Sequence, residues 1–295
     1  MASNIDYSKI YSPYKLGMFA QCPKEYHFYY LDPNYCQLKN DLKKDPRNIW
    51  KFHTLGKAVH NAITLFYHLP PEKRTEKNLL ESLKKTWQSE VYWDKEPPLG
   101  KWGGFETVEE ERASYREALL MLKSFLKMAE IEPEIEYLPT HDFRHSIDDY
   151  KKLITPLNAD FDLSGQFDLI TREVEGALHI IDFKTGKSDR GDTFQLRFYK
   201  VLAEANFEKP VVKASFYFLG TGHKESFDLG GEEVEEIREE ILEKIKEIKA
   251  TRSFFARPGK LCKFCLFRDF CPEGEEVVGV TRDVSAEDYP EDLPF

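Results

Sequence analysis

The chain has 295 residues, of which 41% are hydrophobic and 14% aromatic, and its formal net charge is −10 at pH 7. This composition supplies enough apolar side chains for a sizeable core, and the length allows one or two domains. No run approaches the roughly 18 consecutive apolar residues of a membrane-spanning helix, so such a span is excluded. The N-terminal residues lack the basic and apolar regions of a secretory signal, so we expect a cytoplasmic protein.

Hydrophobic periodicity and turn signals predict the order of elements along the chain. Helices come first, at 13–30, 53–67, 72–91 and 107–128, with a loop rich in Pro and Gly over 94–105. Strands follow at 134–138, 153–157, 161–171 and 177–183. A helix at 194–206 leads to strands at 211–219 and 224–228, a charged helix at 232–250 and a cysteine-rich segment. This order predicts an α/β core with a mixed sheet, flanking helices and a helical cap.

Between the last two strands of the first group, residues 174–176 (Val-Glu-Gly) predict a three-residue hairpin turn, with the glycine in the left-handed conformation. Folding the chain about Glu175 sets Asp168 opposite Asp182, because both lie seven residues from it. Lys184 projects on the same face of its strand as Asp182, because side chains of a strand alternate. The hairpin therefore predicts two carboxylates and one ammonium group close together.

A pair of carboxylates at the end of buried strands favours Mg²⁺ or Mn²⁺, which prefer hard oxygen ligands. A bound ion would polarise a phosphodiester and lower the pKa of a bound water. Lys184 would orient that water or stabilise the negative charge of the transition state. The alternative is an ordinary hairpin whose acids and lysine form surface salt bridges, but a second aspartate in facing register favours the metal site.

Further candidate residues lie on predicted helices. Gln195 and Tyr199 are four residues apart and share one helix face, where they would hold a nucleic-acid strand; the alternative is a solvated glutamine on an amphipathic helix. A neutral imidazole at His60 would complete the metal shell and favour Mn²⁺, although a single helical histidine is more often only packed. Phosphate contacts are predicted for the nearby basic residues Lys187, Arg190, Arg197 and Lys200.

The five cysteines include a C-x2-C-x5-C triplet near the C-terminus. Without a secretion signal, grouped thiols predict metal ligation rather than disulfides. One distant thiol with a compact triplet favours a [4Fe–4S] cluster, whereas Zn²⁺, the alternative, usually takes two close pairs. Cys36 is interpreted as a free thiol. The predicted cluster ligands, which would join the N- and C-terminal regions, are Cys22, Cys262, Cys265 and Cys271.

Taken in order, these pieces resemble the PD-(D/E)xK nuclease superfamily, specifically its RecB-like branch. The cysteine arrangement is similar to that of the iron–sulfur nucleases of the CRISPR-associated Cas-four and AddB groups. The segments that carry the resemblance are Tyr11-Ser12-Pro13-Tyr14-Lys15-Leu16, Gln21-Cys22-Pro23, Gly56-x3-His60, Gly165-x2-Asp168, Asp182-x-Lys184, Gln195-x3-Tyr199 and the C-terminal cysteine triplet.

The resemblance implies a restriction-endonuclease-like core and exonuclease cleavage at DNA ends, often of single strands. It implies a structural role for the iron–sulfur cluster and a place in DNA repair, recombination or CRISPR spacer processing. The site residues so implied are His60, Asp168, Asp182 and the carbonyl of Phe183 for Mg²⁺ or Mn²⁺, Lys184 for catalysis, and Gln195 and Tyr199 for DNA contact.

Much of the negative charge is concentrated in residues 273–295, which hold eight acids and one arginine and so contribute −7 of the −10. A local basic groove elsewhere is therefore compatible with DNA binding. We predict a single nuclease domain over 1–272, with a helical part at 53–131 and a catalytic core at 133–230. The acidic segment at 273–295 is predicted to be a disordered tail.

The tail ends in Leu-Pro-Phe and so resembles the C-terminal peptide of bacterial single-stranded DNA-binding proteins. It would dock on a replication or repair partner or compete with DNA for the enzyme's own groove. A solvated end without a partner is the alternative. The chain has no Walker A loop, so any helicase partner lies on another chain. A CRISPR integrase is a further expected partner.

The sequence leaves three functions to compare. The first is a metal-dependent DNA exonuclease, and the second is a non-catalytic, DNA-end-binding iron–sulfur subunit of a helicase–nuclease complex. The third is a zinc-knuckle adaptor in RNA or protein assembly, which leaves the facing acids unexplained. Because both Asp182 and Lys184 are present, the exonuclease is favoured.

Overall fold

The computed structural model describes residues 6–89, 91, 92, 94–140, 153–186 and 191–274. The helices in this part of the chain are α1 (Pro13–Gln21), α2 (Pro23–Tyr30), α3 (Pro33–Lys44), α4 (Lys51–His68), α5 (Glu76–Thr86), α6 (Val108–Met128), α7 (Thr193–Phe207) and α8 (Val234–Ala250). The strands are β1 (Ile10–Tyr11), β2 (Ile135–Tyr137), β3 (Leu153–Pro156), β4 (Asp162–Gly165), β5 (Leu169–Arg172), β6 (Leu178–Lys184), β7 (Val211–Phe218) and β8 (His223–Asp228). None of the described helices combines the length and apolar character that a membrane crossing requires.

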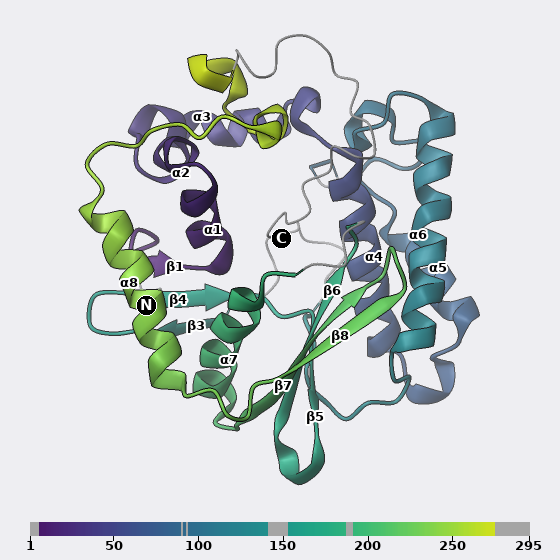
Figure 1. The fold of residues 1–295 in the computed structure, drawn as a ribbon. Helices are drawn as coiled ribbons and strands as arrows, with labels where there is room; N and C mark the ends of the chain where they lie inside the picture. The colour runs from purple at the N-terminus through teal and green to yellow at the C-terminus, as the bar shows by residue number, and fades with distance from the viewer. Residues whose placement is uncertain (1–5, 90, 93, 141–152, 187–190, 275–295) are drawn as a thin grey trace, which may run out of the picture.

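The strands form two mixed sheets that are flanked by helices (Figure 1). The larger sheet has the order β2-β5-β6-β7-β8, in which β6 and β7 are parallel and the other neighbours antiparallel. The smaller sheet has the order β1-β4-β3, with β1 parallel and β3 antiparallel to β4. The parallel pair needs a crossover, which contains α7. This mixed α/β arrangement is consistent with a restriction-endonuclease-like fold.

Strand β6 is buried on both faces, and its alternate side chains enter two different cores. Leu178 and Ile180 pack in a core that includes residues of α1, α7 and α8. Ile181 and Phe183 pack in a second core that includes residues of α4, α5 and α6. Because full burial of each such side chain contributes about 1.5–3 kcal/mol, helices on both sides hold this strand in place.

The β5–β6 hairpin closes through the predicted Val-Glu-Gly turn. Glu175 and the glycine after it both adopt a left-handed backbone, with φ of 63° and 79°, whereas the sequence predicts this for the glycine alone. Leu169 pairs with Ile181 across the hairpin. Continuing this register by one residue sets Asp168 opposite Asp182, so the predicted register is confirmed.

The single strand predicted over 161–171 is wrong, because the chain forms two strands there that belong to different sheets. β4 ends at Gly165 and β5 begins at Leu169. Between them Phe167 is fully buried, with its ring centroid 5.0 Å from that of Tyr199. The chain passes from one sheet to the other at this buried ring. The alternation of apolar and polar residues does not show where one strand ends and the next begins, so it did not predict this break. The break leaves Asp168 immediately before β5.

The helix predicted over 13–30 is two helices that meet at Cys22. This residue has an extended backbone, with φ −151° and ψ 102°, and the Pro23 that follows it suits the first position of a helix. The structure also contains strand β1 and helix α3, which the sequence analysis did not predict. None of the α3 residues is fully buried.

Helix α7 approaches the smaller sheet closely at Gly165. A Cβ atom on this glycine would lie only 2.9 Å from Cε1 of Tyr199, so a larger residue would displace the helix. The start of α7 is fixed by Asp192, whose side chain accepts a hydrogen bond from the Phe194 N–H at 2.9 Å. Together these contacts set the position of Gln195 relative to the end of β6.

Candidate active site

Polar side chains from three parts of the fold meet at one end of the β5–β6 hairpin. The strands of the hairpin end there, so groups from α4 on one side and α7 on the other reach the same place. The side chains brought together are His60 of α4, Asp168 before β5, Asp182 and Lys184 of β6, and Gln195 and Tyr199 of α7.

The Asp168 carboxylate is held by two groups. Its Oδ1 lies 2.9 Å from Nδ1 of His60, and its Oδ2 accepts a hydrogen bond from the Phe183 N–H at 2.8 Å. The bond to Phe183 ties the carboxylate to the neighbouring strand. The bond to His60 ties the hairpin to α4, which is more than 100 residues away in sequence.

Asp182, Lys184 and Gln195 form a triangle of polar contacts. The Lys184 Nζ lies 3.0 Å from Oδ2 of Asp182 and donates a hydrogen bond to Oε1 of Gln195 at 2.8 Å. The Gln195 Nε2 donates to Oδ1 of Asp182 at 3.1 Å and lies 3.3 Å from the Tyr199 hydroxyl. Gln195 is buried and orients both the acid and the lysine, a role that the sequence analysis does not give it.

One oxygen of this group is left without a directed partner. Oδ2 of Asp182 is buried, and its close contact is the ion pair with the Lys184 ammonium at 3.0 Å rather than a further hydrogen bond. Such an atom in a polar site is the arrangement expected where a further cation completes the group.

The electrostatics of the site also favour an additional positive charge. Burial raises the pKa of Asp182; the Lys184 charge opposes this shift and the Asp168 charge adds to it. Burial disfavours a charged imidazole at His60, but the Asp168 carboxylate outweighs burial and raises the pKa of His60. A divalent cation would favour the ionised aspartates and the neutral imidazole, and so would reverse both shifts.

The described residues contain no group of three or more His, Cys, Asp or Glu side chains already placed around a common ion position. His60 and Asp168 are paired with each other, and Asp182 is paired with Lys184. The donor set nevertheless fits a hard divalent ion, since it offers two carboxylates, an imidazole and one orphaned buried oxygen.

The predicted basic residues are not all gathered at this site. Arg197 is paired with Glu232 at 2.7 Å and also with Glu240, so carboxylates flanking and within α8 neutralise it. Lys200 is buried and paired with an acid one turn along α7. The remaining two predictions, Lys187 and Arg190, lie outside the described residues.

A family model described as the PD-(D/E)XK nuclease superfamily matches residues 10–272, which include all six side chains of the site. The chain belongs to the PD-(D/E)XK nuclease superfamily. This membership indicates a nuclease that depends on a metal ion, and such nucleases usually use Mg²⁺ or Mn²⁺.

No curated protein matches this nuclease. Among solved structures, the one titled "Crystal structure of SSO0001" is similar, with 19% identity over 74% of this chain and 84% of that chain. The TM-score of the pair is 0.32, and at that value the likeness decides neither the fold nor the activity.

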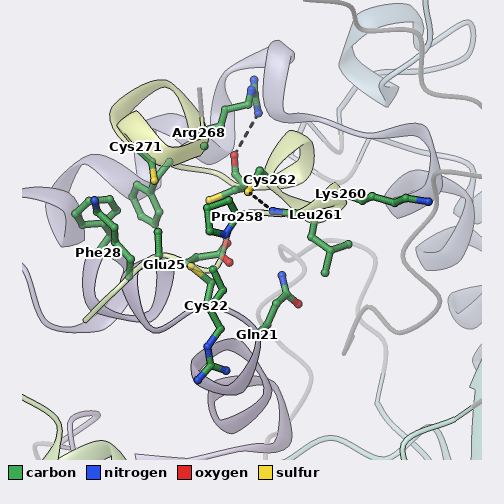
Figure 2. Close-up of a pocket in the computed structure, with 17 residues that line it drawn as sticks. Gln21, Cys22, Glu25, Phe28, Pro258, Lys260, Leu261, Cys262, Arg268 and Cys271 are labelled. Carbon is green, nitrogen blue, oxygen red and sulfur yellow. Dashed lines mark hydrogen bonds between the residues drawn. The ribbon is translucent and has the colours of Figure 1, made fainter. Parts of the chain in front are cut away.

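A pocket of about 290 Å³ is lined by cysteines from both ends of the described chain (Figure 2). Cys22 comes from the junction of α1 and α2, and three cysteines come from the C-terminal segment. Cys36 lies elsewhere, with its Sγ 3.4 Å from the Tyr29 carbonyl oxygen. The four cysteines that line the pocket are Cys22, Cys262, Cys265 and Cys271.

Charged residues share this pocket, and the sequence analysis does not single them out. Burial raises the pKa of Glu25, which lies within hydrogen-bonding reach of the Cys265 thiol. Burial likewise raises the pKa of Cys265. Lys24 pairs with Glu273 at 2.6 Å. The sequence could have indicated Lys24 and Glu25 by their position, because they directly follow Cys22-Pro23.

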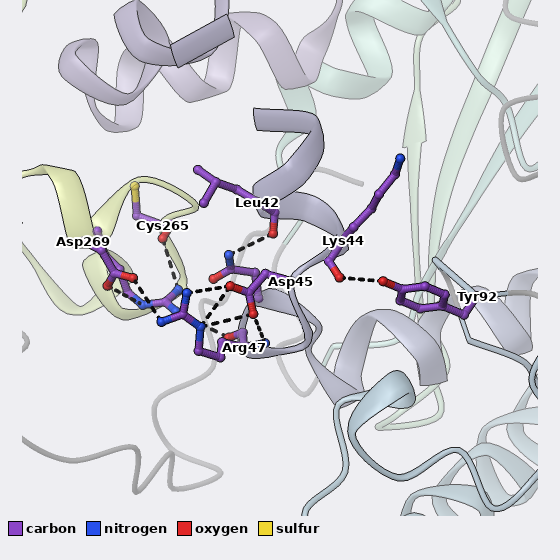
Figure 3. Close-up of polar contacts among 9 residues, drawn as sticks. Leu42, Lys44, Asp45, Arg47, Tyr92, Cys265 and Asp269 are labelled. Atoms are coloured by element: carbon purple, nitrogen blue, oxygen red, sulfur yellow. Dashed lines mark hydrogen bonds and ion pairs between the residues drawn. The ribbon is translucent and has the colours of Figure 1, made fainter. Parts of the chain in front are cut away.

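Polar contacts join the C-terminal segment to the loop between α3 and α4 (Figure 3). The Arg47 guanidinium lies 2.6 Å from the Asp45 carboxylate and 4.0 Å from that of Asp269. The Arg268 guanidinium donates to the Arg47 carbonyl at 3.4 Å and to the Cys265 carbonyl at 3.4 Å. The cysteine-bearing segment is therefore connected to the start of α4, the helix that carries His60.

Proposed function

We propose that this protein is a DNA exonuclease of the RecB-like branch that hydrolyses phosphodiester bonds at DNA ends with Mg²⁺ or Mn²⁺. The observation that carries the proposal is the pair of facing aspartates, with Lys184 3.0 Å from an oxygen of Asp182 that is buried and accepts no hydrogen bond. The likeness to the Cas-four nucleases rests on the cysteine spacing and on the pocket that these cysteines line.

In this proposal each polar group has one task. The metal would be held by His60, Asp168 and Asp182, with the Phe183 carbonyl as a further ligand. When bound, such an ion polarises a phosphoryl oxygen and lowers the pKa of a bound water. Lys184, held in place by Gln195, would stabilise the extra negative charge of the transition state.

The decisive test is digestion of end-labelled single-stranded DNA with Mg²⁺ or Mn²⁺. We expect the wild type to shorten the strand from its ends, and Lys184→Ala to reduce the rate by about 100- to 1,000-fold while DNA binding persists. Lys224→Ala, which removes an exposed lysine on β8, is the matched control and should cleave at the wild-type rate. Binding without any cleavage by the wild type would instead favour the non-catalytic end-binding subunit.

We further infer that the cysteine pocket holds a structural [4Fe–4S] cluster. Four thiols line one pocket, and burial disfavours the bare thiolate at Cys265, so a cation is needed to keep that group ionised. Anaerobically purified protein should be brown, absorb visible light and contain about four iron and four sulfide per chain. Colourless protein with one equivalent of zinc would replace this inference with a zinc site.

We also propose that residues 1–272 form one domain. Contacts between distant segments support this, because β1 pairs with β4 and α1 packs against both α7 and α8. Limited proteolysis should release no stable fragment smaller than this unit. Cleavage into two folded halves would contradict a single domain.

The predicted acidic tail lies outside the described residues, apart from its first two. Its proposed partners remain a single-stranded-DNA-linked repair protein, a helicase or a CRISPR integrase. Deleting residues 283–295 should weaken partner capture or raise nuclease activity. Unchanged capture together with unchanged activity would remove the tail from the proposal.

A further inference from the structure

A cluster of aromatic rings lies at the N-terminal end of α4, where the C-terminal segment meets it. We call Trp50, Phe52, His53 and Phe264 the aromatic cluster. The Trp50 and Phe52 rings are near-parallel, at 13° and 6.1 Å between centroids. Phe264 meets them edge-on, at 5.0 Å from Trp50 and 5.5 Å from Phe52, and His53 lies 4.4 Å from Phe52. Residues more than 200 positions apart therefore build one aromatic surface.

This cluster is separate from the two hydrophobic cores. None of its residues belongs to either core or packs against one, and all are only half-buried. Cations lie beside the rings: the Lys263 ammonium is 5.2 Å from the Phe264 ring centre, and the Arg268 guanidinium is 5.9 Å from that of Trp50. Half-buried rings with adjacent cations are more typical of a binding surface than of a folding core.

The helix that begins at this cluster also leads to the active site. His53 and His60 are seven residues apart on α4, so they share one helix face, with Lys57 near the same line. At a rise of about 1.5 Å per residue, His60 lies about 10 Å along the axis from His53. Aromatic and basic side chains therefore form a line that ends at the predicted metal ligand.

We propose that the aromatic cluster is a stacking platform for bases of the single DNA strand that enters the active site. This inference rests on the proposed function and adds the form of the substrate. A base in a single strand presents a flat face that can stack on Trp50, Phe52 or Phe264, whereas bases in a duplex are already stacked on one another. Lys57 and Lys263 supply the charge that attracts the phosphates.

The platform gives the C-terminal segment a direct role in substrate binding. Phe264 lies between Cys262 and Cys265, so the segment that lines the cysteine pocket also provides one wall of the aromatic cluster. Loss of order in this segment would remove Phe264 from Trp50 and Phe52. Binding of a DNA strand would then weaken, although every residue of the candidate active site would still be present.

The first test compares strands with and without bases, using the protein with Lys184→Ala so that cleavage does not interfere. Fluorescence anisotropy would measure the binding of labelled oligo(dT), and of an abasic strand of equal length, with Mg²⁺ present. Because stacking is lost without bases, we expect the abasic strand to bind about 5- to 100-fold more weakly. Equal binding of the two strands would overturn the proposed stacking platform. This test requires no variant of the aromatic cluster.

The second test assigns the difference to the cluster. Phe52→Leu and Phe264→Leu keep apolar volume but remove the ring faces, so each should weaken oligo(dT) binding and leave abasic-strand binding unchanged. Phe270→Leu is the matched control, since this exposed phenylalanine lies on the same segment but contacts Tyr35 instead. Equal loss for all three variants, or no loss for any, would contradict the platform.

The two proposals can fail separately. A wild type that cleaves DNA ends but binds abasic and oligo(dT) strands equally would refute the platform and retain the nuclease. A wild type that discriminates between the strands but never cleaves would refute the exonuclease and retain the platform.

Discussion

Strand β6 carries two buried polar groups whose surroundings differ sharply. His179 faces the side of Ile181 and Phe183, and Asp182, three residues later, faces the opposite side. The His179 ring lies between the Glu173 carboxylate, 3.1 Å from Nδ1, and the Ser215 hydroxyl, 2.7 Å from Nε2. With the proton on Nδ1, both ring nitrogens have partners.

The chain of hydrogen bonds at His179 continues to the surface, because Ser215 Oγ lies 2.8 Å from the hydroxyl of Ser226 on β8. At Asp182, by contrast, the second carboxylate oxygen accepts no hydrogen bond. A complete network stabilises the fold, whereas an incomplete one is tolerated where a ligand is to be bound. One strand thus carries a polar group whose hydrogen bonds are complete, His179, and one that is left open for the proposed metal ion, Asp182.

The largest expected effect is that of Asp182→Asn, which should lower the cleavage rate by at least about 1,000-fold. The same change removes the carboxylate partner of Lys184 but also the repulsion between Asp182 and Asp168, so the free energy of unfolding should fall by less than the about 3–5 kcal/mol of an unopposed buried ion pair. Cleavage of end-labelled DNA and urea unfolding would measure the two quantities. A large loss of stability would show that Asp182 is structural, like His179.

His179→Ala should give the opposite result. It leaves a cavity and removes the partner of Ser215 and Glu173, so the free energy of unfolding should fall by about 2–4 kcal/mol. The cleavage rate per folded molecule should remain that of the wild type. His223→Ala, at an exposed position on β8, is the control and should be nearly neutral. A strong loss of cleavage activity in folded His179→Ala protein would contradict the purely structural role of His179.

Gln195→Ala tests whether the Gln195 amide orients Lys184 and Asp182 for cleavage. Removing the amide frees Lys184 and Asp182 from a shared partner, so the cleavage rate should fall by about 10- to 100-fold. Asn206→Ala, an exposed amide on the same helix, is the matched control. An unchanged rate for Gln195→Ala would mean that Lys184 is oriented without it.

The smallest expected effect is a pH dependence of stability. Burial lowers the pKa of His179 to about 3, and the Lys213 and Lys224 charges act in the same direction, while the close Glu173 carboxylate opposes them. Below pH 6.5 the unfolded chain therefore binds a proton that the folded chain does not. The free energy of unfolding should fall by up to about 1.4 kcal/mol per pH unit in this range.

Urea unfolding between pH 7.5 and 5 would measure this slope. His179→Ala should flatten it, because the titrating group is gone. The raised pKa values of His60 and Asp182 act with the opposite sign, since they favour the folded state as the pH falls, so the difference in slope between the wild type and His179→Ala is the quantity that isolates His179. An equal slope in the wild type and in His179→Ala would place the titration elsewhere.

Features of this protein that depend on local spacing could be predicted from the amino-acid sequence alone. The β5–β6 register follows from equal distances to Glu175, and the shared face of Asp182 and Lys184 follows from strand alternation. The Gln195 and Tyr199 pair follows from helical periodicity. These relations involve neighbours along one or two elements, and their geometry is fixed by the backbone.

Contacts between groups that are distant in the sequence could not be predicted and were found in the folded chain. The tertiary structure showed that Gln195 bridges Asp182 and Lys184, that Arg197 is neutralised by Glu232 and Glu240, and that Phe264 packs against Trp50. It also divided the strand predicted over 161–171 between two sheets. Such contacts depend on how helices and sheets pack across the core, and that packing is a property of the whole chain rather than of any local pattern.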